Sequence, residues 1–528
     1  MGCGIGGTVS TNPASPTFDQ FANLSVLVAG AGVSGIATVR ALLSLGADVT
    51  IADSREKALE PAVELGARGL LLDPDNSPTS ETLDGYQLVV TSPGWKPDSP
   101  LLVLAHERGL PVWGDVDFAW RLDQSGILGP PRTWLAITGT NGKTTTTTML
   151  HSVLRAAGLS SAACGNIGLP ILDALFTGAS EGSGARVDVL AVELSSFQLH
   201  WAPSLRPEAG VILNIAEDHL DWHGSMQAYV DAKLQVLTGK VGVLGLDDPV
   251  AASLVSRSQA ERTVGFRLDS PAENEIGIVD GTVIDRAFGD ADGIMPAADI
   301  QPNGRPGVLD GLAAAALARA IGVSADAIAE GLRTHETGPH RNAFVAEVRG
   351  VRYVDDSKAT NPHAAHASLT TYPRVVWVAG GQLKGASVEE LVPAVREQLV
   401  GAVVIGVDRR QIGDTIARHA PDVPVVEVIA GDDGTVTATL IHNGRRNSAL
   451  PAHVPPGADS TGGHTPGGNS ADDVMRLAVY SAAQLAEPGD TVVLAPSAAS
   501  LDMFRDYGHR GRSFASAVSA LAQLGAHP

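Results

Sequence analysis

The segment AITGTNGKTTTTT, residues 136–148, combines residue types that bind phosphate. An apolar stretch, Thr133 to Gly139, runs into a glycine turn that ends in Lys143 and Thr144, at the expected start of a helix. Backbone N–H groups there would bind phosphate oxygens, Lys143 would neutralise charge and Thr144 would ligate Mg²⁺. The usual G-x-x-x-x-G-K-[ST] spacing is not met, because Ile137 stands where its first glycine would be. The pattern still favours nucleotide binding over a plain surface turn.

Acidic residues and a histidine follow two further apolar stretches. Glu193 lies near the end of VDVLAVEL, and a carboxylate there is costly to bury unless it meets a cation. The next apolar stretch ends in NIAEDHLDWHG, which offers Asp218, His219 and Asp221. A lone histidine is more often structural than a ligand, but His219 follows its strand at the same expected sheet edge. We therefore expect Glu193 and His219 to bind Mg²⁺ beside the phosphate loop.

A lysine interrupts the apolar face of the helix expected in SMQAYVDAKLQVL, residues 225–237. At 100° per residue, Lys233 falls in the middle of one stripe, formed with Met226, Tyr229, Val230, Leu234 and Leu237. Such a lysine must snorkel, pair with a carboxylate, lose its proton or be chemically altered. A neutral amine can capture CO₂ to give a carbamate, an oxygen anion able to bind Mg²⁺. The pattern alone favours snorkelling.

Polar residues also follow the apolar stretches of the last third of the chain. In VRYVDDSKATNP, residues 351–362, alternation of an extended chain lets Asp356, Lys358 and Thr360 face one direction. Lys384 follows RVVWVAGGQL, and Ser500 follows TVVLAPSAA. Open α/β sheets bind ligands just past their strand ends. Together these residues predict an anion site, most simply for a carboxylate.

Three α/β units would position these residues. The first contains Gly30-Ala31-Gly32-Val33-Ser34-Gly35 between a strand and a helix, with Asp53 about 20 positions on, which fits a dinucleotide or another nucleotide. We expect a Rossmann-like domain over residues 1–122, a central P-loop ATPase-type domain over 123–337 and a Rossmann-like domain over 338–528. Residues 1–24 are expected to be disordered. Residues 443–473, rich in Gly, Pro, Ser and His, are expected to form a mobile insertion.

Composition excludes several classes of protein. The 528 residues contain 37 Lys plus Arg against 58 Asp plus Glu, a net charge of −21, which argues against nucleic-acid and anionic-membrane surfaces. Two cysteines, Cys3 and Cys164, are too few for a disulfide framework or a cysteine-based zinc site. The chain begins without the pattern of a signal peptide, and no apolar run is long enough to cross a membrane. We expect a cytoplasmic, monomeric protein.

The motifs, taken in order, resemble those of the Mur ligase family. They are GTNGKTT, GNIGLP, ELSSFQL, EDHLDWHG, AYVDAKL, DDSKATNP and SLDMF, and they span about residues 25 to 525 outside the insertion. DSKATN with the late SLDMF resembles the branch that adds D-glutamate to UDP-N-acetylmuramoyl-L-alanine. The resemblance implies that ATP converts the alanine carboxylate into an acyl phosphate, which the amine of D-glutamate then attacks.

The resemblance also implies roles for matched residues, with His340 reaching toward ATP. ATP would contact Gly139, Thr140, Asn141, Gly142, Lys143, Thr144, Thr145, Asp310, Arg341, Asp356 and Lys358. Catalysis and two Mg²⁺ sites would use Lys143, Thr144, Glu193, His219 and Lys233, with Lys233 as a carbamate made from CO₂. The UDP-sugar would contact Val33, Ser34, Asp53, Ser54, Arg55, Gly94 and Asn166. D-Glutamate would contact Thr360, Lys384, Ser500, Leu501 and Tyr507.

Two positions depart from the family pattern. Asp310 stands where an adenine-contacting Asn is expected, and Tyr507 replaces a Phe near the amino-acid pocket. Three other functions compete with this interpretation. A nicotinamide-dependent oxidoreductase would explain Gly30 to Asp53 but not the Lys143 loop. Another amide ligase, of the folylpolyglutamate or Mur type, is a nearer rival, and a catalytically dead binding protein would not need Lys143, Glu193 and Lys233 together.

Overall fold

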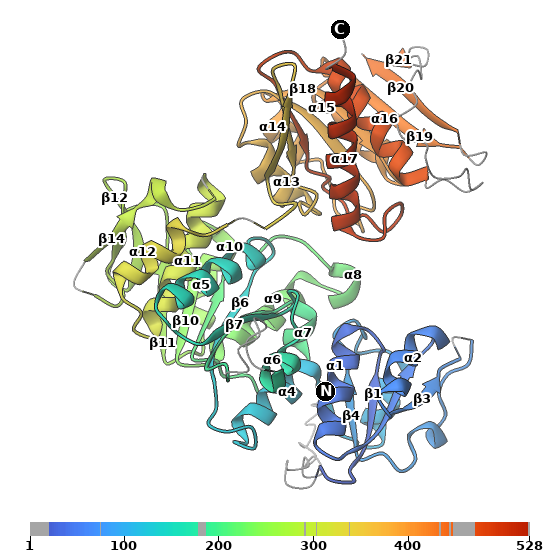
Figure 1. The fold of residues 1–528 in the computed structure, drawn as a ribbon, viewed down its shortest axis with the longest axis vertical. Coiled ribbons are helices and arrows are strands. Elements are labelled where there is room, and N and C mark those ends of the chain that lie inside the picture. The colour runs from blue at the N-terminus through green and yellow to red at the C-terminus, as the bar shows by residue number, and fades with distance from the viewer. Residues whose placement is uncertain are drawn as a thin grey trace, which may run out of the picture. The chain divides into compact units, whose positions relative to one another are not determined.

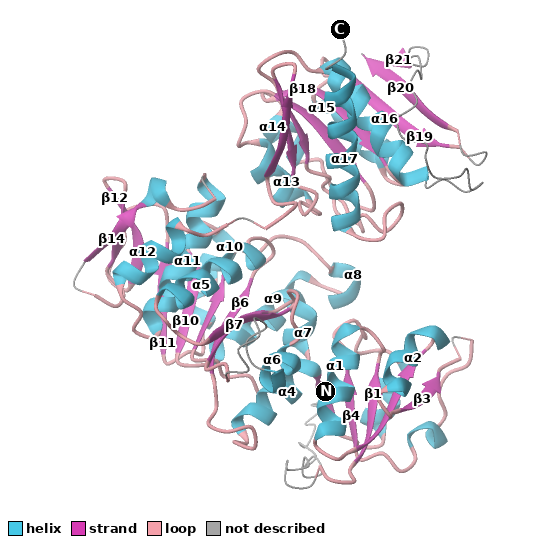
Figure 2. Ribbon diagram, viewed as in Figure 1, coloured by secondary structure: helices cyan, strands magenta, loops and turns pink. Residues whose placement is uncertain are grey.

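The computed structural model describes residues 21–73, 75–177, 186–289, 292–302, 304–336, 338–431, 435–442, 445–446 and 470–525. These residues form three α/β sheets with flanking helices (Figures 1 and 2). Contacts divide the chain into two compact units. The first comprises Met1–Ile215 with Trp222–His335, and the second comprises Ala216–Asp221 with Glu336–Pro528. The division after His335 falls close to the boundary expected at 337.

The N-terminal sheet is parallel throughout and has the strand order β3-β2-β1-β4-β5, as in a Rossmann-like domain. Its strands are β1 (Ser25–Ala29), β2 (Asp48–Asp53), β3 (Arg68–Leu71), β4 (Leu88–Thr91) and β5 (Val112–Gly114). Its helices are α1 (Val33–Ser44), α2 (Glu56–Glu64), α3 (Pro100–Glu107) and α4 (Asp115–Gln124). The turn before α1 needs glycine, because Gly30 has φ +99° and a Cβ on Gly35 would lie 1.9 Å from the Gly30 carbonyl oxygen.

The central sheet has nine described strands in the order β14-β13-β12-β11-β10-β9-β6-β8-β7. They are β6 (Thr133–Thr138), β7 (Ser161–Gly165), β8 (Val189–Glu193), β9 (Ala209–Ile212), β10 (Val241–Gly245), β11 (Arg262–Phe266), β12 (Glu275–Val279), β13 (Thr282–Asp285) and β14 (Asp292–Pro296). Only the pairs with β13 are antiparallel among those described. The helices are α5 (Lys143–Ala156), α6 (Ile171–Thr177), α7 (Ser196–His200), α8 (Leu220–His223), α9 (Met226–Leu234), α10 (Pro249–Ser253), α11 (Arg305–Ala320) and α12 (Ala325–Arg333).

The C-terminal sheet has eight described strands in the order β15-β16-β22-β17-β18-β19-β20-β21, parallel from β16 to β19. They are β15 (Ala343–Val348), β16 (Val351–Asp355), β17 (Val375–Gly380), β18 (Leu399–Ile405), β19 (Val425–Ala430), β20 (Val436–His442), β21 (Arg445–Arg446) and β22 (Thr491–Leu494). Its helices are α13 (Pro362–Leu369), α14 (Leu391–Val395), α15 (Arg409–His419), α16 (Ser470–Leu485) and α17 (Tyr507–Gly525). The expected three-sheet α/β fold is confirmed.

Three expected boundaries need correction. Within the segment 1–24, Phe21 is fully buried against Phe118 and Trp113, so the last four residues of that segment are ordered; the rest lies outside the described residues. The boundary at 122 falls inside α4, because one hydrophobic core continues from the N-terminal sheet into the central one. The expected insertion 443–473 lies mostly outside the described residues, but its edges belong to β21 and α16.

Among the described residues, we find no helix whose length and hydropathy would suit a membrane span.

Candidate functional site

The phosphate loop lies between β6 and α5, as the sequence predicted. Gly142 has φ +83°, a left-handed conformation that favours glycine, and it leads directly into the first turn of α5. The Lys143 ammonium donates to the carbonyl oxygens of Gly139 at 2.9 Å and Thr140 at 2.8 Å. The lysine therefore folds back over the loop, where its charge lies beside the N-terminal N–H groups of a 14-residue helix.

Lys233 points inward and does not snorkel, so the sequence-based preference for snorkelling was wrong. It is 1% exposed, and its ammonium donates to the Gly139 carbonyl at 2.8 Å and to the Thr138 hydroxyl at 3.3 Å. The Tyr229 ring lies 4.6 Å from the same ammonium and so adds a cation–π contact. From α9, which packs against α7, the Lys233 side chain reaches Thr138, the last residue of β6, and Gly139 just beyond it. Lys143 and Lys233 thus converge on one carbonyl oxygen of the loop.

Glu193 lies at the carboxyl end of β8, next to the loop strand β6. It pairs with Ile137 in the sheet register and is nearly fully buried. Its Oε1 accepts from the Asn166 side-chain amide at 2.9 Å, whereas its Oε2 is buried with no hydrogen-bond partner in the described part of the chain. A buried carboxylate oxygen in this state favours a bound cation.

Asn141 of the phosphate loop is hydrogen-bonded to Asn214, which follows β9. The Asn214 side-chain oxygen accepts from the Asn141 N–H at 2.9 Å. In return, the Asn214 amide donates to the Asn141 carbonyl at 3.2 Å, and the Asn214 carbonyl accepts from the Thr140 N–H. Because β9, β6, β8 and β7 are neighbours, Asn214, the loop, Glu193 and Asn166 line one edge of the sheet.

Asp310 contacts the phosphate loop from α11. Its Oδ1 accepts from the Thr146 hydroxyl at 3.2 Å, and a Cβ on Gly142 would lie 2.2 Å from the same oxygen. The contact explains why residue 142 is glycine. Asp310 thus braces the loop and α5; contact with adenine remains a prediction.

Apart from Asn166, which follows β7, the residues expected to bind the UDP-sugar lie at or after the ends of three neighbouring strands, β2, β1 and β4. Asp53 accepts from the backbone N–H groups of Ala31 and Arg55 and from the Arg55 guanidinium. Burial opposes ionisation of Asp53, but these hydrogen bonds outweigh it and lower its pKa. Val33 is 72% exposed at the start of α1, and the Gly94 carbonyl accepts from the Trp222 indole at 3.4 Å.

The C-terminal sheet presents a second group of predicted residues. After β16, Ser357 and Ala359 are buried and Lys358 and Thr360 are partly exposed, but the segment is not extended as predicted, because the Ala359 N–H donates to the Asp356 carbonyl in a turn. The Lys358 ammonium lies 4.0 Å from the centre of the Tyr507 ring. Burial raises the pKa of Asp356 to about 6, although hydrogen bonds and Arg341 oppose the shift.

His340 lies beside this group because β15 runs antiparallel to β16, with Ala343 opposite Asp355. Its Nδ1 is 2.6 Å from the Asp355 carboxylate, which is itself buried. A Cβ on Gly511 of α17 would lie 2.1 Å from the same Nδ1, so glycine there makes room for the pair. Asp355 therefore fixes the orientation of the His340 ring.

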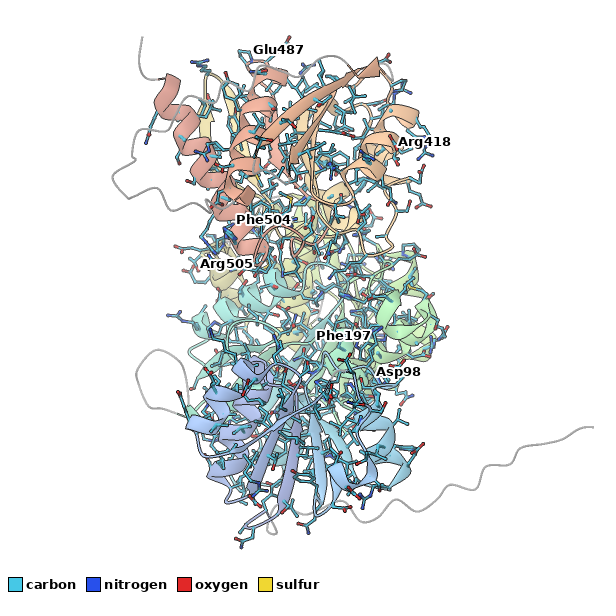
Figure 3. The ribbon with its side chains drawn as sticks, turned by 90° about the vertical axis from the view of Figure 1, so that its right-hand side faces the viewer. Asp98, Phe197, Arg418, Glu487, Phe504 and Arg505 are labelled. Carbon is cyan, nitrogen blue, oxygen red and sulfur yellow. The ribbon has the colours of Figure 1, made fainter. Side chains whose placement is uncertain are left out.

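Arg510 of α17 is a fully buried arginine under the loops that contain Thr360, Lys384 and Ser500. Its guanidinium donates to the carbonyl oxygens of Ser357 at 2.9 Å, Gly380 at 3.2 Å and Ala498 at 3.0 Å. It also donates to the Ser357 hydroxyl at 3.0 Å, and burial lowers its pKa to about 10. Phe504 and Arg505 mark the segment between Ser500 and α17 (Figure 3).

Comparison with known proteins gives matches along nearly the whole chain. Three family models match: "Mur ligase MurD-like, N-terminal domain" over residues 24–114, "Mur ligase middle domain" over 137–286 and "Mur ligase, glutamate ligase domain" over 340–447. The UDP-N-acetylmuramoylalanine–D-glutamate ligase of Rhodococcus jostii is 56% identical over 503 residues, which cover 95% of this chain and 96% of that protein. The chain belongs to the Mur ligase family.

Other Mur ligases support the same assignment. The UDP-N-acetylmuramoylalanine–D-glutamate ligase of Nocardia farcinica is 57% identical over 499 residues, 94% of this chain and 96% of that protein. Among solved structures, the UDP-N-acetylmuramate-alanine ligase MurC of Thermotoga maritima has a TM-score of 0.54 at 17% identity, covering 94% of this chain and 99% of that one. At that identity the structural match establishes the shared fold.

The two units separate the predicted Mur ligase site residues into groups. The first unit brings together Lys143, Glu193, Asn166 and Lys233 around the loop, and Val33, Asp53 and Gly94 along the N-terminal edge. The second unit contains Thr360, Lys384, Ser500, Leu501 and Tyr507 together with Arg341, Asp356 and Lys358. His219 has φ +55° and groups with the second unit, so the structure does not place it in one unit with Glu193. In the described ranges, no three His, Cys, Asp or Glu side chains cluster as metal ligands.

Sequence reasoning missed Asp115, the first residue of α4. Its side chain lines a pocket with Ser34, Gln198 and Gly165, and its Oδ1 is buried with no hydrogen-bond partner in the described ranges. Burial raises the pKa of Asp115 to about 6, although hydrogen bonds with Ser34 and Gln198 oppose the shift. Its position just after the short strand β5 was the sequence signal that could have identified Asp115 as a candidate site residue.

The Asp115→Asn variant is expected to be more stable than wild type at pH 8 but not at pH 4. The acid is protonated in both folded and unfolded chains below its ordinary value of 3.8, and above about 6 the folded chain must bear a buried charge. Wild-type stability should therefore fall by about 3 kcal/mol between these limits, and the Asn variant should lack that fall. Thermal unfolding at pH 4, 6 and 8 measures it. Asp98→Asn, at an exposed position (Figure 3), is the control, and an equal pH dependence of all three proteins would contradict the prediction.

Proposed function

We propose that this protein is an ATP-dependent, ADP-forming ligase that joins D-glutamate to UDP-N-acetylmuramoyl-L-alanine in peptidoglycan precursor synthesis. The convergence of Lys143 and Lys233 on the Gly139 carbonyl, beside the buried Glu193, is the observation that supports it most directly. The D-glutamate ligases at 56% and 57% identity support the choice of substrates. As all proposed site residues belong to one chain, we further propose a monomer, acting in the cytoplasm where ATP and UDP-linked precursors are made.

The chemistry requires activation of a carboxylate. Displacement of oxide from the alanine carboxylate is unfavourable, so transfer of the γ-phosphoryl group of ATP first converts it into an acyl phosphate and releases ADP. The amine of D-glutamate then attacks the carbonyl carbon, the C–N bond forms, the C–O bond to phosphate breaks and the amine loses a proton. In this scheme Lys143 and the N–H groups at the start of α5 neutralise phosphate charge, and the loop positions the transferred group.

The residues near the loop fit Mg²⁺. The Oε2 of Glu193, which has no hydrogen-bond partner among the residues that the structure describes, is the kind of oxygen ligand such an ion prefers, and Thr144 follows Lys143 at the start of α5. We propose that Thr144 and Glu193 bind one Mg²⁺ and His219 the second, where the ions supply charge neutralisation. Lys233 lies buried beside the loop, where a carbamate formed from its amine and CO₂ would add an oxygen anion to this set.

We assign the substrates to the two remaining groups. Val33, Ser34, Asp53, Ser54, Arg55 and Gly94 bind the uridine diphosphate, and Asn166 contacts the sugar-peptide. Arg341, Asp356 and Lys358 bind the nucleotide from the C-terminal sheet, with His340 reaching toward it. Thr360, Lys384, Ser500, Leu501 and Tyr507 bind D-glutamate. The carboxyl-edge position of each group in its sheet supports these assignments.

Phosphate release tests the function. With ATP, Mg²⁺ and UDP-N-acetylmuramoyl-L-alanine, release is expected to depend on added D-glutamate and to yield one ADP per amide. Release that instead requires L-glutamate with a folate would assign the protein to folylpolyglutamate-type ligases. Release with no dependence on any amino acid, or no release at all, would contradict the proposal.

A further inference from the structure

The turn after β17 has an unusual backbone. Gly380, Gly381 and Gly385 have φ values of +121°, +132° and +82°, and Lys384 has φ +53° although it has a side chain. A non-glycine residue in the left-handed region is strained and persists only where its surroundings fix it. Lys384 is exposed, so its own side chain does not supply that restraint. The restraint must come from groups that bind the backbone of the turn.

Asp408, in the segment between the neighbouring strand β18 and α15, supplies one restraint. Its Oδ2 accepts from the Leu383 N–H at 2.7 Å, and its own N–H donates to the Gly381 carbonyl at 3.1 Å. Asp408 is also the N-cap residue of α15, where an aspartate side chain ordinarily accepts from the first turn of its helix. Here the side chain makes no such cap bond. The carboxylate is therefore used to fix the Lys384 turn and not the helix.

The opposite side of the turn is tied to the Ser500 loop. Gln382 and Ala499 exchange two backbone hydrogen bonds of 2.9 Å. Asp502 connects the Ser500 loop to the segment before α15, because its Oδ2 accepts from the N–H of Val407, the residue before Asp408, at 2.9 Å. The Lys384 turn, the segment before α15 and the Ser500 loop thus form one closed set of contacts around the carboxyl edge of β22, β17 and β18.

We propose that Asp408 is a positioning residue that sets the affinity for the amino-acid substrate by fixing where the Lys384 ammonium meets a substrate carboxylate. The inference rests on the proposed function, since it takes Lys384 and Ser500 as the ligands of D-glutamate. Asp408 itself acts through the Leu383 N–H and does not touch the substrate. Loss of its carboxylate frees the Lys384 backbone to leave its strained conformation, which moves the ammonium away from the carboxylate position.

Steady-state kinetics of Asp408→Ala test the proposal. The KM for D-glutamate is expected to rise about tenfold or more, while the KM values for ATP and UDP-N-acetylmuramoyl-L-alanine and the kcat change less than about threefold. Asp408→Asn keeps an acceptor oxygen for the Leu383 N–H, so it is expected to restore most of the affinity. A general loss of structure would instead change all three KM values or kcat.

Asp248→Ala is the matched control, because Asp248 is the N-cap of α10 and its side chain does bond the first turn, to the Ala251 N–H at 2.7 Å. It is expected to lower the melting temperature without raising the KM for D-glutamate. An unchanged KM for D-glutamate in Asp408→Ala, or no rescue in Asp408→Asn, would overturn the role of Asp408 and leave the proposed function intact. Wild-type protein without D-glutamate-dependent phosphate release would instead reject the proposed function.

Discussion

Replacement of Lys233 by alanine is expected to reduce turnover by about a thousandfold or more. The change removes an ammonium that contacts the Gly139 carbonyl at 2.8 Å and the Thr138 hydroxyl at 3.3 Å, so the phosphate loop loses a buried positive contact. Under the proposed function it also removes the carbamate oxygens that would join Glu193 around Mg²⁺. A thousandfold loss corresponds to about 4 kcal/mol of transition-state stabilisation, which is typical of an electrostatic group in a water-excluded site.

Chemical rescue separates the loss of the ammonium contact with the loop from the loss of the carbamate oxygens. Acetate or propionate is expected to restore part of the turnover, because a small carboxylate can enter the space left by the side chain and supply an oxygen anion. Chloride at the same ionic strength should not. Lys240→Ala is the control, since Lys240 is exposed and pairs with Glu208 at the surface, and it should keep nearly full activity. Turnover of Lys233→Ala within about tenfold of wild type, without additive, would contradict the prediction.

Residues that follow strands were predictable because topology fixes their place. Lys143, Glu193, Lys384 and Ser500 each come just after an apolar stretch, and parallel strands end at the same edge of a sheet. The alternation of buried and exposed residues after β16 was predicted from an extended chain, whose period is two, but the structure has a turn at Ser357 and Lys358. For Lys233, by contrast, the periodicity identified the face of α9 but not the carbonyl that the ammonium would meet.

Residues that act across long sequence separations gave no comparable signal. Arg510 contacts Ser357 across 153 positions, and Asp408 contacts Leu383 across 25. An aspartate before a helix ordinarily caps it and an arginine is ordinarily exposed, so local propensity alone indicates neither the Leu383 contact of Asp408 nor the burial of Arg510. Only the packing of three loops around one sheet edge determines what these side chains bind. A different long-range contact set, the hydrophobic core shared by the N-terminal and central sheets, explains why the domain boundary expected at 122 fell within α4.

Arg510→Leu is expected to destabilise the C-terminal unit by about 3–5 kcal/mol. The substitution removes a buried guanidinium, so three carbonyl oxygens lose their hydrogen-bond donor. Those oxygens belong to Ser357, Gly380 and Ala498, in the loops that lead to Thr360, Lys384 and Ser500. The KM for D-glutamate should therefore rise together with the loss of stability. Arg510→Lys should give an intermediate result, since one ammonium cannot reach all the acceptors of a planar guanidinium.

Thermal unfolding and D-glutamate kinetics measure both consequences of the Arg510 change. Arg418→Leu is the matched control: Arg418 is exposed (Figure 3), pairs with Glu389 at the surface and should cost less than about 1 kcal/mol. Equal losses of stability in the two variants would show that the buried contacts of Arg510 contribute no more than a surface ion pair. Loss of stability with an unchanged KM for D-glutamate would show that the three loops keep their relative positions without the guanidinium. The expected joint effect follows because one side chain binds all three loops at once.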